Sequence, residues 1–402
     1  MFGIAEWLVQ NWWFLFHEVR RFESFSPRML PGQHAWIQRH CLRAADSSLS
    51  LPSIVLFHDG RTLRADWMSD LPGSMPHYSV EFSDQGSTSL DAESTQDYLA
   101  EFVNDVLRRA RNIQDGRVSA LRQLWAAIRQ ADLEEQEFCK TSAKLGIDPY
   151  DSENMSGSLV QFIENELVDP DRPLVRDLIE LPVVSEVKAQ WDWVQALQVE
   201  LHLDGYVRPE RWDDDFLFTA IRADRQRVTM PEEGLSAAYA EAYDDAHRLR
   251  ACLQIGDHDP IGSIDQIASR LPLRSLEVVT HNHVPGSGIR ALLGQSNRKL
   301  VIASPRAVRS DSKRFLQARS LYQWFFSDRD SLRLVTDGYA WDQRASRAFA
   351  AELLAPQAAL QARLTSNDAT DADILNLSVE FQVSTEVIRR QLENAGVRIL
   401  ED

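Results

Sequence analysis

The chain has 402 residues, more than one ordinary domain, and its 44% hydrophobic content is enough to bury a core in each of two or three domains. A formal net charge of −17 works against non-specific nucleic-acid binding, because phosphate contacts need clustered lysine and arginine. Three cysteines, odd in number and far apart, are typical of free thiols in a reducing compartment and argue against a disulfide framework.

Residues 1–16 are apolar enough to raise the question of a signal peptide or a membrane segment. The run is too short to span a bilayer and is interrupted by Glu6 and Asn11, and it lacks the basic start and the cleavage site of a signal peptide. We therefore expect a cytoplasmic protein with no membrane association.

Residues 1–112 are expected to form an α+β N-terminal domain. The first 45 residues are rich in tryptophan and phenylalanine, which predicts a buried core element, with a partner-binding surface as the alternative. Apolar and polar residues alternate over 53–57, 63–67 and 78–82. These runs predict a small antiparallel sheet, and after a Ser/Asp-rich link the apolar spacing predicts a helix over 98–110. No catalytic motif is found in this domain.

Residues 113–259 are expected to form a helical middle region. Apolar spacing predicts helices over 121–128, 138–145, 159–167, 191–201 and 238–249. The part from about 118 to 168 resembles a helix-turn-helix, but the helix that would read DNA carries Glu164 and Glu166 and no lysine or arginine. A structural bundle is therefore favoured, with a DNA reader as the alternative. The acidic stretch 211–215 is interpreted as solvated surface, or else as a docking surface for a basic partner.

A third domain is expected over 260–402. Strands are predicted over 276–280, 288–293 and 299–303, the last two joined by a turn at 294–297. His281 and His283 follow the first strand, and alternate strand residues point to one side, so both imidazoles could meet a metal ion. No carboxylate or cysteine follows at ligand spacing, so we interpret this cluster as an ordinary loop.

The segment 313–356 is the most informative part of the chain. Apolar side chains recur at helical spacing at Phe315, Ala318, Tyr322 and Phe325. They predict an amphipathic helix with one face in a core. A run of small residues around Phe349 and Leu353 predicts a second, closely packed helix that Pro356 ends.

Two further helices are predicted over 371–381 and 387–395, again with helix-turn-helix spacing. Arg389 and Arg390 are offset by Glu386 and Glu393. Packing against the third domain is therefore favoured over DNA binding.

The segment 313–356 resembles the core of the ImmA/IrrE family of zinc metallopeptidases, and the resemblance extends over roughly 260–402. The family pattern is an arginine and a phenylalanine leading into HExxH, then a glutamate shortly before a segment of the type FAAELLxP. The resemblance implies a zincin-like domain with a small sheet, whose edge strand holds the substrate peptide, and packed helices that bind zinc. It also implies a bacterial stress-response, mobile-element or phage-defence setting, in which active relatives cleave repressor or antitoxin-like proteins.

The motif is degenerate where the family places its chemistry. The first ligand histidine falls on Arg319 and the second on Gln323, the general-base glutamate falls on Ser320, and the third ligand falls on Gln343. Zinc needs three histidine, carboxylate or thiolate donors and an open position for water. We therefore predict that these four positions are not catalytic and that no zinc is bound.

The same positions can still form a binding pocket. Its candidate residues are Arg319, Tyr322, Gln323, Gln343 and Arg347. Since an unpaired buried arginine is very unfavourable, we expect a partner or solvent at Arg319 and propose pairing with an acid such as Asp342 or Glu352. Binding of an anion or a peptide carboxylate in this pocket is an alternative.

These observations predict a pseudoprotease: a non-catalytic regulator or scaffold that binds a protein partner, for example a protein encoded beside it. One alternative is an active metallopeptidase with unaligned ligands such as His258, His281 or His283. Another is a DNA-binding regulator that uses Arg389 and Arg390, although direct DNA binding is not favoured.

Overall fold

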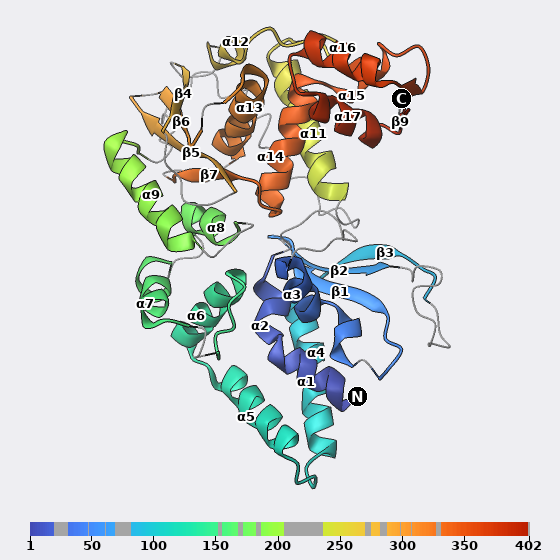
Figure 1. The fold of residues 1–402 in the computed structure, drawn as a ribbon, viewed down its shortest axis with the longest axis vertical. Helices are drawn as coiled ribbons and strands as arrows, with labels where there is room; N and C mark the ends of the chain where they lie inside the picture. Colours follow the sequence, from blue (N-terminus) through green and yellow to red (C-terminus); the bar gives the residue numbers. More distant parts are fainter. Residues whose placement is uncertain are drawn as a thin grey trace. The chain divides into compact units, whose positions relative to one another are not determined.

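The computed structural model describes residues 1–19, 31–46, 48–60, 62–68, 82–151, 155–167, 172–181, 186–204, 236–269, 275–281, 288–297, 299–306, 308–326 and 331–400. The fold is α+β and mainly helical, as predicted (Figure 1). The described residues up to 167 form unit 1 and those from 172 onward form unit 2. The boundaries predicted near 112 and 259 therefore fall inside these units, and the acidic stretch 211–215 lies outside the described residues.

Unit 1 combines helices with a three-stranded antiparallel sheet of order β1-β2-β3. Its elements are α1 (Phe2–Gln10), α2 (Trp12–His17), α3 (Pro31–His40), the 3-10 helix η1 (Leu42–Ala45), β1 (Ser53–His58), β2 (Leu63–Met68), β3 (Gly86–Leu90), α4 (Ala92–Arg109), α5 (Gly116–Gln130), α6 (Leu133–Lys144) and α7 (Gly157–Glu166). The predicted small antiparallel sheet is confirmed.

The third strand of this sheet was not predicted. β3 lies in the stretch interpreted as a link, and the run predicted at 78–82 lies outside the described residues except for Phe82. β3 has the sequence Gly-Ser-Thr-Ser-Leu and so carries little apolar alternation. Its register with β2 places Gly86 against Trp67, where an added Cβ would lie 2.5 Å from the indole. The strand is therefore defined by backbone pairing and by a glycine under an aromatic ring, neither of which gives a hydrophobic pattern.

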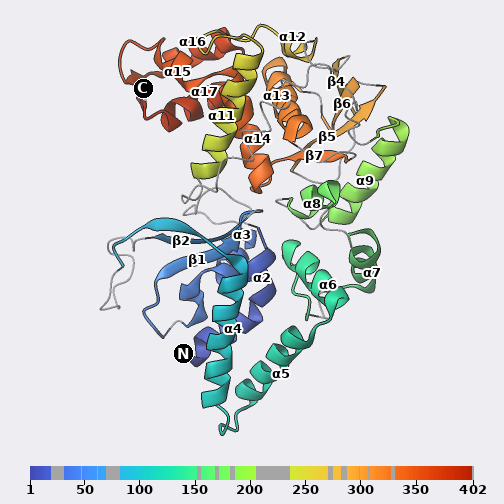
Figure 2. The same cartoon turned by 180° about the vertical axis from the view of Figure 1, so that it is seen from behind.

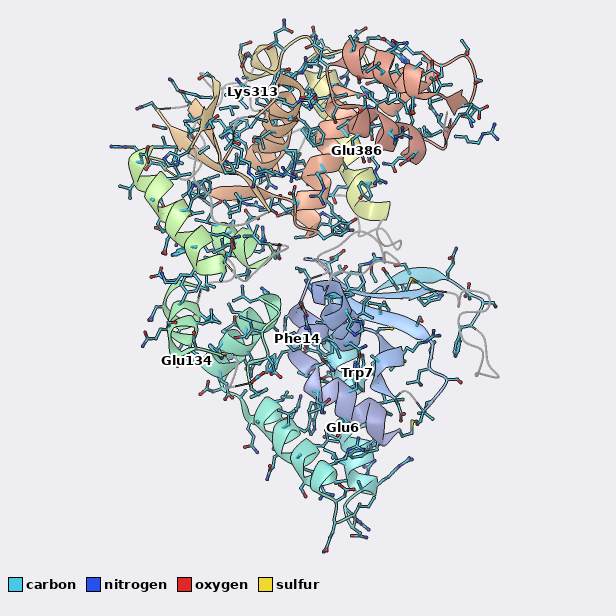
Figure 3. All side chains as sticks on the ribbon, in the orientation of Figure 1. Glu6, Trp7, Phe14, Glu134, Lys313 and Glu386 are labelled. Carbon is cyan, nitrogen blue, oxygen red and sulfur yellow. The ribbon has the colours of Figure 1, made fainter. Side chains whose placement is uncertain are left out.

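The aromatic residues of α1 and α2 form the core of unit 1, which confirms the predicted core element. Trp7, Trp12 and Phe14 are buried, and the rings of Trp12 and Trp125 lie 4.9 Å apart. Trp7 and Phe14 are labelled in Figure 3, together with Glu6, whose carboxylate pairs with Arg117 at the surface. The aromatic density at the start of the chain is thus used for packing α1 and α2 against α4, α5 and α6.

A buried charged cluster joins the end of α2 to α3 and β1. Glu18 accepts hydrogen bonds from Arg39 Nε at 2.9 Å and Nη2 at 2.6 Å, and it lies 3.1 Å from His40 Nε2. The other ring nitrogen of His40 lies 2.6 Å from the Leu56 carbonyl oxygen. Both ring nitrogens of His40 therefore lie within hydrogen-bond distance of an oxygen atom. Burial alone would raise the pKa of Glu18, but the hydrogen bonds and charges of His40 and Arg39 lower it to about 2.

This cluster predicts acid sensitivity of unit 1. The folded-state pKa of Glu18 lies below the ordinary value of 4.5, so its contribution is present above that pH and is lost as the pH falls from 4.5 to about 2. At neutral pH this carboxylate contributes about 3 kcal/mol to the free energy of unfolding. We expect the free energy of unfolding of unit 1, followed by tryptophan fluorescence in urea, to fall over this range in the wild type. In Glu18→Gln it should already be lower at neutral pH and fall less on acidification; equal pH slopes would contradict the assignment.

Unit 2 contains a mixed four-stranded sheet of order β4-β6-β5-β7, in which β4 and β6 are parallel and the other pairs antiparallel. Its elements are α8 (Pro173–Ile179), α9 (Val187–Glu200), α11 (Ser236–Cys252), α12 (Ile264–Ser269), β4 (Leu276–Thr280), β5 (Ile289–Ser296), β6 (Lys299–Ser304), α13 (Ser310–Phe326), β7 (Arg333–Thr336), α14 (Trp341–Leu354), α15 (Gln357–Gln361), β8 (Asp368–Ala369), α16 (Asp371–Phe381), α17 (Thr385–Asn394) and β9 (Arg398–Ile399).

Helices α13 and α14 pack against each other beside this sheet, and α11 packs along α14, as the two opposite views agree (Figures 1 and 2). The predicted strands β4, β5 and β6 are confirmed, but the turn predicted at 294–297 starts too early because β5 continues to Ser296. Gly294 serves close packing instead: an added Cβ would lie 2.8 Å from both Leu203 and Leu332.

Helices α16 and α17 form the predicted pair at the end of the chain. Arg389 pairs with Asp371 at 2.6 Å, and Arg390 pairs with Glu386 at 3.1 Å. Glu386, labelled in Figure 3, lies on the exposed face of α17. Among the described residues, no helix is both long and apolar enough to cross a membrane.

Candidate functional site

Helices α13 and α14 bring two of the degenerate motif positions into contact. Arg319 on α13 donates from Nη2 to Gln343 Oε1 on α14 at 3.0 Å, and both side chains are buried. Ser320 Oγ donates to the Leu316 carbonyl one turn earlier at 2.8 Å, so its hydroxyl is held by its own helix. Gln323 lies at the margin of this group, with Nε2 3.5 Å from the Asp342 carbonyl oxygen.

The remaining two candidate residues have different surroundings. Tyr322 is part of the core, with its ring 5.3 Å from that of Phe349 and 4.7 Å from that of Phe326. Arg347, on α14, donates from Nη2 to the Gly338 carbonyl at 3.0 Å and is half-buried. The helical spacing thus places Tyr322 in the core and leaves Arg347 with partial access to solvent.

Arg319 and Gln343 both bind the outer edge of strand β7. Gln343 Nε2 donates to the Leu334 carbonyl at 2.8 Å, and Gln343 Oε1 accepts from the Thr336 amide at 2.9 Å. One side-chain amide therefore bonds to residues i and i+2 of the strand, as a residue of a neighbouring strand would. Arg319 Nη2 donates to the Thr336 carbonyl at 2.8 Å.

Asp177 on α8 completes this edge. Its Oδ2 accepts from the Leu334 amide at 2.9 Å, and Gln343 Nε2 lies 3.3 Å from its Oδ1. Both amides and both carbonyls of Leu334 and Thr336 are thereby satisfied by side chains of α8, α13 and α14. Since an unpaired buried backbone group costs about 1–3 kcal/mol, these side chains substitute for a further strand.

Asp177 also forms the buried ion pair of the site. Arg333 on β7 donates to its two oxygens at 2.7 and 3.0 Å. Asp342 extends the network, accepting from Arg333 at 3.2 Å and from Arg176 at 2.9 Å. The sequence analysis missed Asp177 and Arg333. The available signal was charge within two apolar runs: the adjacent Arg176 and Asp177 between Val175 and Leu178, and a single arginine beside Leu334.

The prediction that Arg319 pairs with Asp342 or Glu352 was wrong. Asp342 is held by Arg176 and Arg333, and Glu352 accepts from Gln391 at 2.7 Å and lies 3.1 Å from His247 Nε2. Arg319 instead donates to neutral oxygens, including Ser346 Oγ at 3.2 Å. Burial, and then the charge of Arg347, lowers the pKa of Arg319 well below its usual range.

The Glu352 carboxylate organises a second polar group, which ties α14 to α11 and α17. Gln391 on α17 donates to it, and the Gln391 amide oxygen accepts from Tyr243 Oη on α11 at 2.6 Å. Hydrogen bonding to Glu352, opposed by burial, raises the pKa of His247. The inner face of α17 is therefore used for packing within unit 2.

Metal-binding residues do not converge within the described part of the chain. No three histidine, cysteine, aspartate or glutamate side chains there lie close enough together to hold a metal ion. His281 Nε2 lies 2.9 Å from Glu200 Oε2 on α9, and His283 lies outside the described residues. With Ser320 bonded to its own helix and Arg319 and Gln343 bonded to β7, this arrangement is suited to holding helices and sheet together.

Comparison with known proteins adds no relative: neither a scan of protein-family models nor a search of curated proteins finds a match to this chain.

Proposed function

We propose that this chain is a non-catalytic, zincin-like relative of the ImmA/IrrE metallopeptidases that works by binding a protein partner, as a regulator or scaffold in a bacterial stress, mobile-element or phage-defence system. The observation that carries the proposal is the use of Arg319 and Gln343. In an active relative these positions would ligate zinc, whereas here both side chains are bonded to the backbone of β7. A fixed cation and an amide are also poor zinc ligands.

The open edge of the sheet supports partner binding. β7 is closed by side chains, and β4 forms the other edge. Ser275 O and His281 N bond toward β6, so by the alternation of a strand the backbone groups of Leu276, Val278 and Thr280 point away from it. Among the described residues no partner bonds to these groups. Such an edge is a site for pairing with an extended segment of another protein.

Two other functions have less support. A metallopeptidase would need ligands drawn from residues such as His258, His281 or His283, and His281 is engaged with Glu200. A DNA-binding regulator would need free cations on α17, and Arg389 and Arg390 are paired with carboxylates.

Metal content and cleavage test the absence of catalysis. We expect the purified chain to contain substoichiometric zinc and to leave a repressor-type substrate intact, both before and after dialysis against zinc. Stoichiometric zinc that is lost in His281→Ala with His283→Ala would overturn the proposal, since it would identify an unaligned metal site.

A proline at Val278 tests the binding edge. Proline removes the outward amide of Val278 and is tolerated on an edge strand, so the fold should be retained. We expect Val278→Pro to lose partners that co-purify with the wild type at native expression, while Val278→Ala, which keeps the amide, retains them. Equal recovery of the same partner by both variants would place the contact elsewhere.

A further inference from the structure

Positive charge exceeds negative charge on the side of α14 that faces the turn after β7. Arg319 and Arg347 lie close enough that the Arg347 charge is the second cause, after burial, of the lowered pKa of Arg319. Asp337, the carboxylate whose charge acts on both arginines, is held by Arg290 through two contacts of 2.8 Å. The nearby charge of Asp337 thus acts on both Arg319 and Arg347, although its carboxylate is already paired with Arg290.

The two arginines differ in how their donors are used. Arg319 is enclosed, and its guanidinium donates to Thr336 O, Gln343 Oε1 and Ser346 Oγ. Arg347 is only half-buried, and among the described residues its hydrogen bond to Gly338 O is the one that the guanidinium makes. A guanidinium has five N–H donors in a planar fork, so Arg347 keeps donors available for a further acceptor.

An aromatic ring fixes the orientation of this guanidinium. Arg347 lies over the Tyr339 ring with its central carbon 5.8 Å from the ring centroid, and Arg344 lies 5.9 Å from the same centroid. A guanidinium held by a ring and by one carbonyl is preorganised, so little side-chain entropy is lost when an oxyanion binds its remaining edge.

We propose that Arg347, seated on Tyr339 and backed by Arg319, binds an oxyanion, either a carboxylate or a phosphate. The anion supplies the direct ion pair that no described carboxylate forms with Arg347, and it relieves the repulsion between the two arginines. The site is independent of zinc chemistry and of the β4 edge, so it goes beyond the proposed function.

Thermal unfolding with added anions tests this site. In the full chain we expect inorganic phosphate to raise the unfolding midpoint in a saturable manner, beyond the effect of sodium chloride at equal ionic strength. Arg347→Gln should weaken the apparent affinity by about tenfold or more, the loss of one charge-assisted contact, and Arg347→Lys should restore part of it. If Arg347→Gln fails to fold, Arg347→Lys still gives a reading, because a point charge without the planar fork should bind more weakly than the wild type.

Arg363 provides a matched control. It lies 5.1 Å from the Phe381 ring centroid and donates to the Ala359 carbonyl, but it is paired with Glu380. Arg363→Gln should therefore keep the phosphate response. No saturable response in the wild type to phosphate or acetate, or the same response in Arg347→Gln, would overturn the proposal. Binding of a short peptide with a free C-terminal carboxylate but not of its amide would assign the anion to a polypeptide, and binding of phosphate alone would assign it to a free phosphate.

Discussion

Replacing Asp177 by alanine is expected to destabilise unit 2 by about 4 kcal/mol, the range measured for breaking one side of a buried ion pair. The substitution leaves the buried Arg333 without its bidentate partner and leaves the Leu334 amide without an acceptor. Denaturant unfolding of the full chain should show an earlier transition for unit 2. Hydrogen exchange at the Leu334 amide, which donates directly to Asp177, should accelerate.

Arg176, a partly exposed neighbour of the Asp177–Arg333 pair, supplies the control. Arg176 also contacts an aspartate of the network, at 2.9 Å, but the two side chains are 32% and 29% exposed. Arg176→Ala should therefore cost less than about 1 kcal/mol. If Asp177→Ala cost no more than Arg176→Ala, the network would not be holding β7 in place.

Replacing Gln343 by leucine is the second large expected effect. Leucine has a similar size but no hydrogen-bonding atoms, so the Thr336 amide, the Leu334 carbonyl and one donor of Arg319 lose their partner together. At about 1–3 kcal/mol for each buried group, the expected loss is about 4 kcal/mol. Exchange of the Thr336 amide should report it directly, because this amide donates only to Gln343 among the described residues.

Gln361 is the matched control for this substitution. It is also a helical glutamine that donates to a backbone carbonyl, that of Ala395 at 3.1 Å, but it is exposed. Gln361→Leu should change stability by less than about 0.5 kcal/mol. A similar small change in Gln343→Leu would mean that water or a shifted side chain can replace the amide at β7.

Local signals were sufficient for much of the fold. Apolar spacing predicted the helices that became α4, α13, α14, α16 and α17, alternation predicted β1 and β2, and short strand-like runs, two of them flanking a turn, predicted β4 to β6. Strands β3 and β7 were not predicted from the sequence because their patterns are not amphipathic. β3 is polar, carries a glycine under Trp67 and has no buried apolar face, whereas β7 is buried along its whole length and has no exposed face, so neither strand shows apolar-polar alternation.

The sequence predicted the helices of the candidate site but not the partners of its side chains. Helical spacing was enough to place Arg319 and Gln343 on two helices, and the family resemblance implied that these helices face each other, but neither identified the partners of the two side chains. The sequence suggested a carboxylate for Arg319, whereas the structure gives it neutral oxygens and gives the carboxylate Asp177 to Arg333. The pairing joins residues 156 positions apart, and no local pattern encodes such a distance.

What the sequence determined by itself is the absence of zinc-ligand side chains at four positions: Arg319, Ser320, Gln323 and Gln343 offer no histidine, carboxylate or thiolate. What only the tertiary structure decided is the present use of these positions. Helix packing brings α8, α13 and α14 to the edge of β7, and the buried peptide groups of that edge must be satisfied. For this reason Arg319 and Gln343 bond to backbone, while Arg347, one turn further along α14 from Gln343, keeps donors available for an anion.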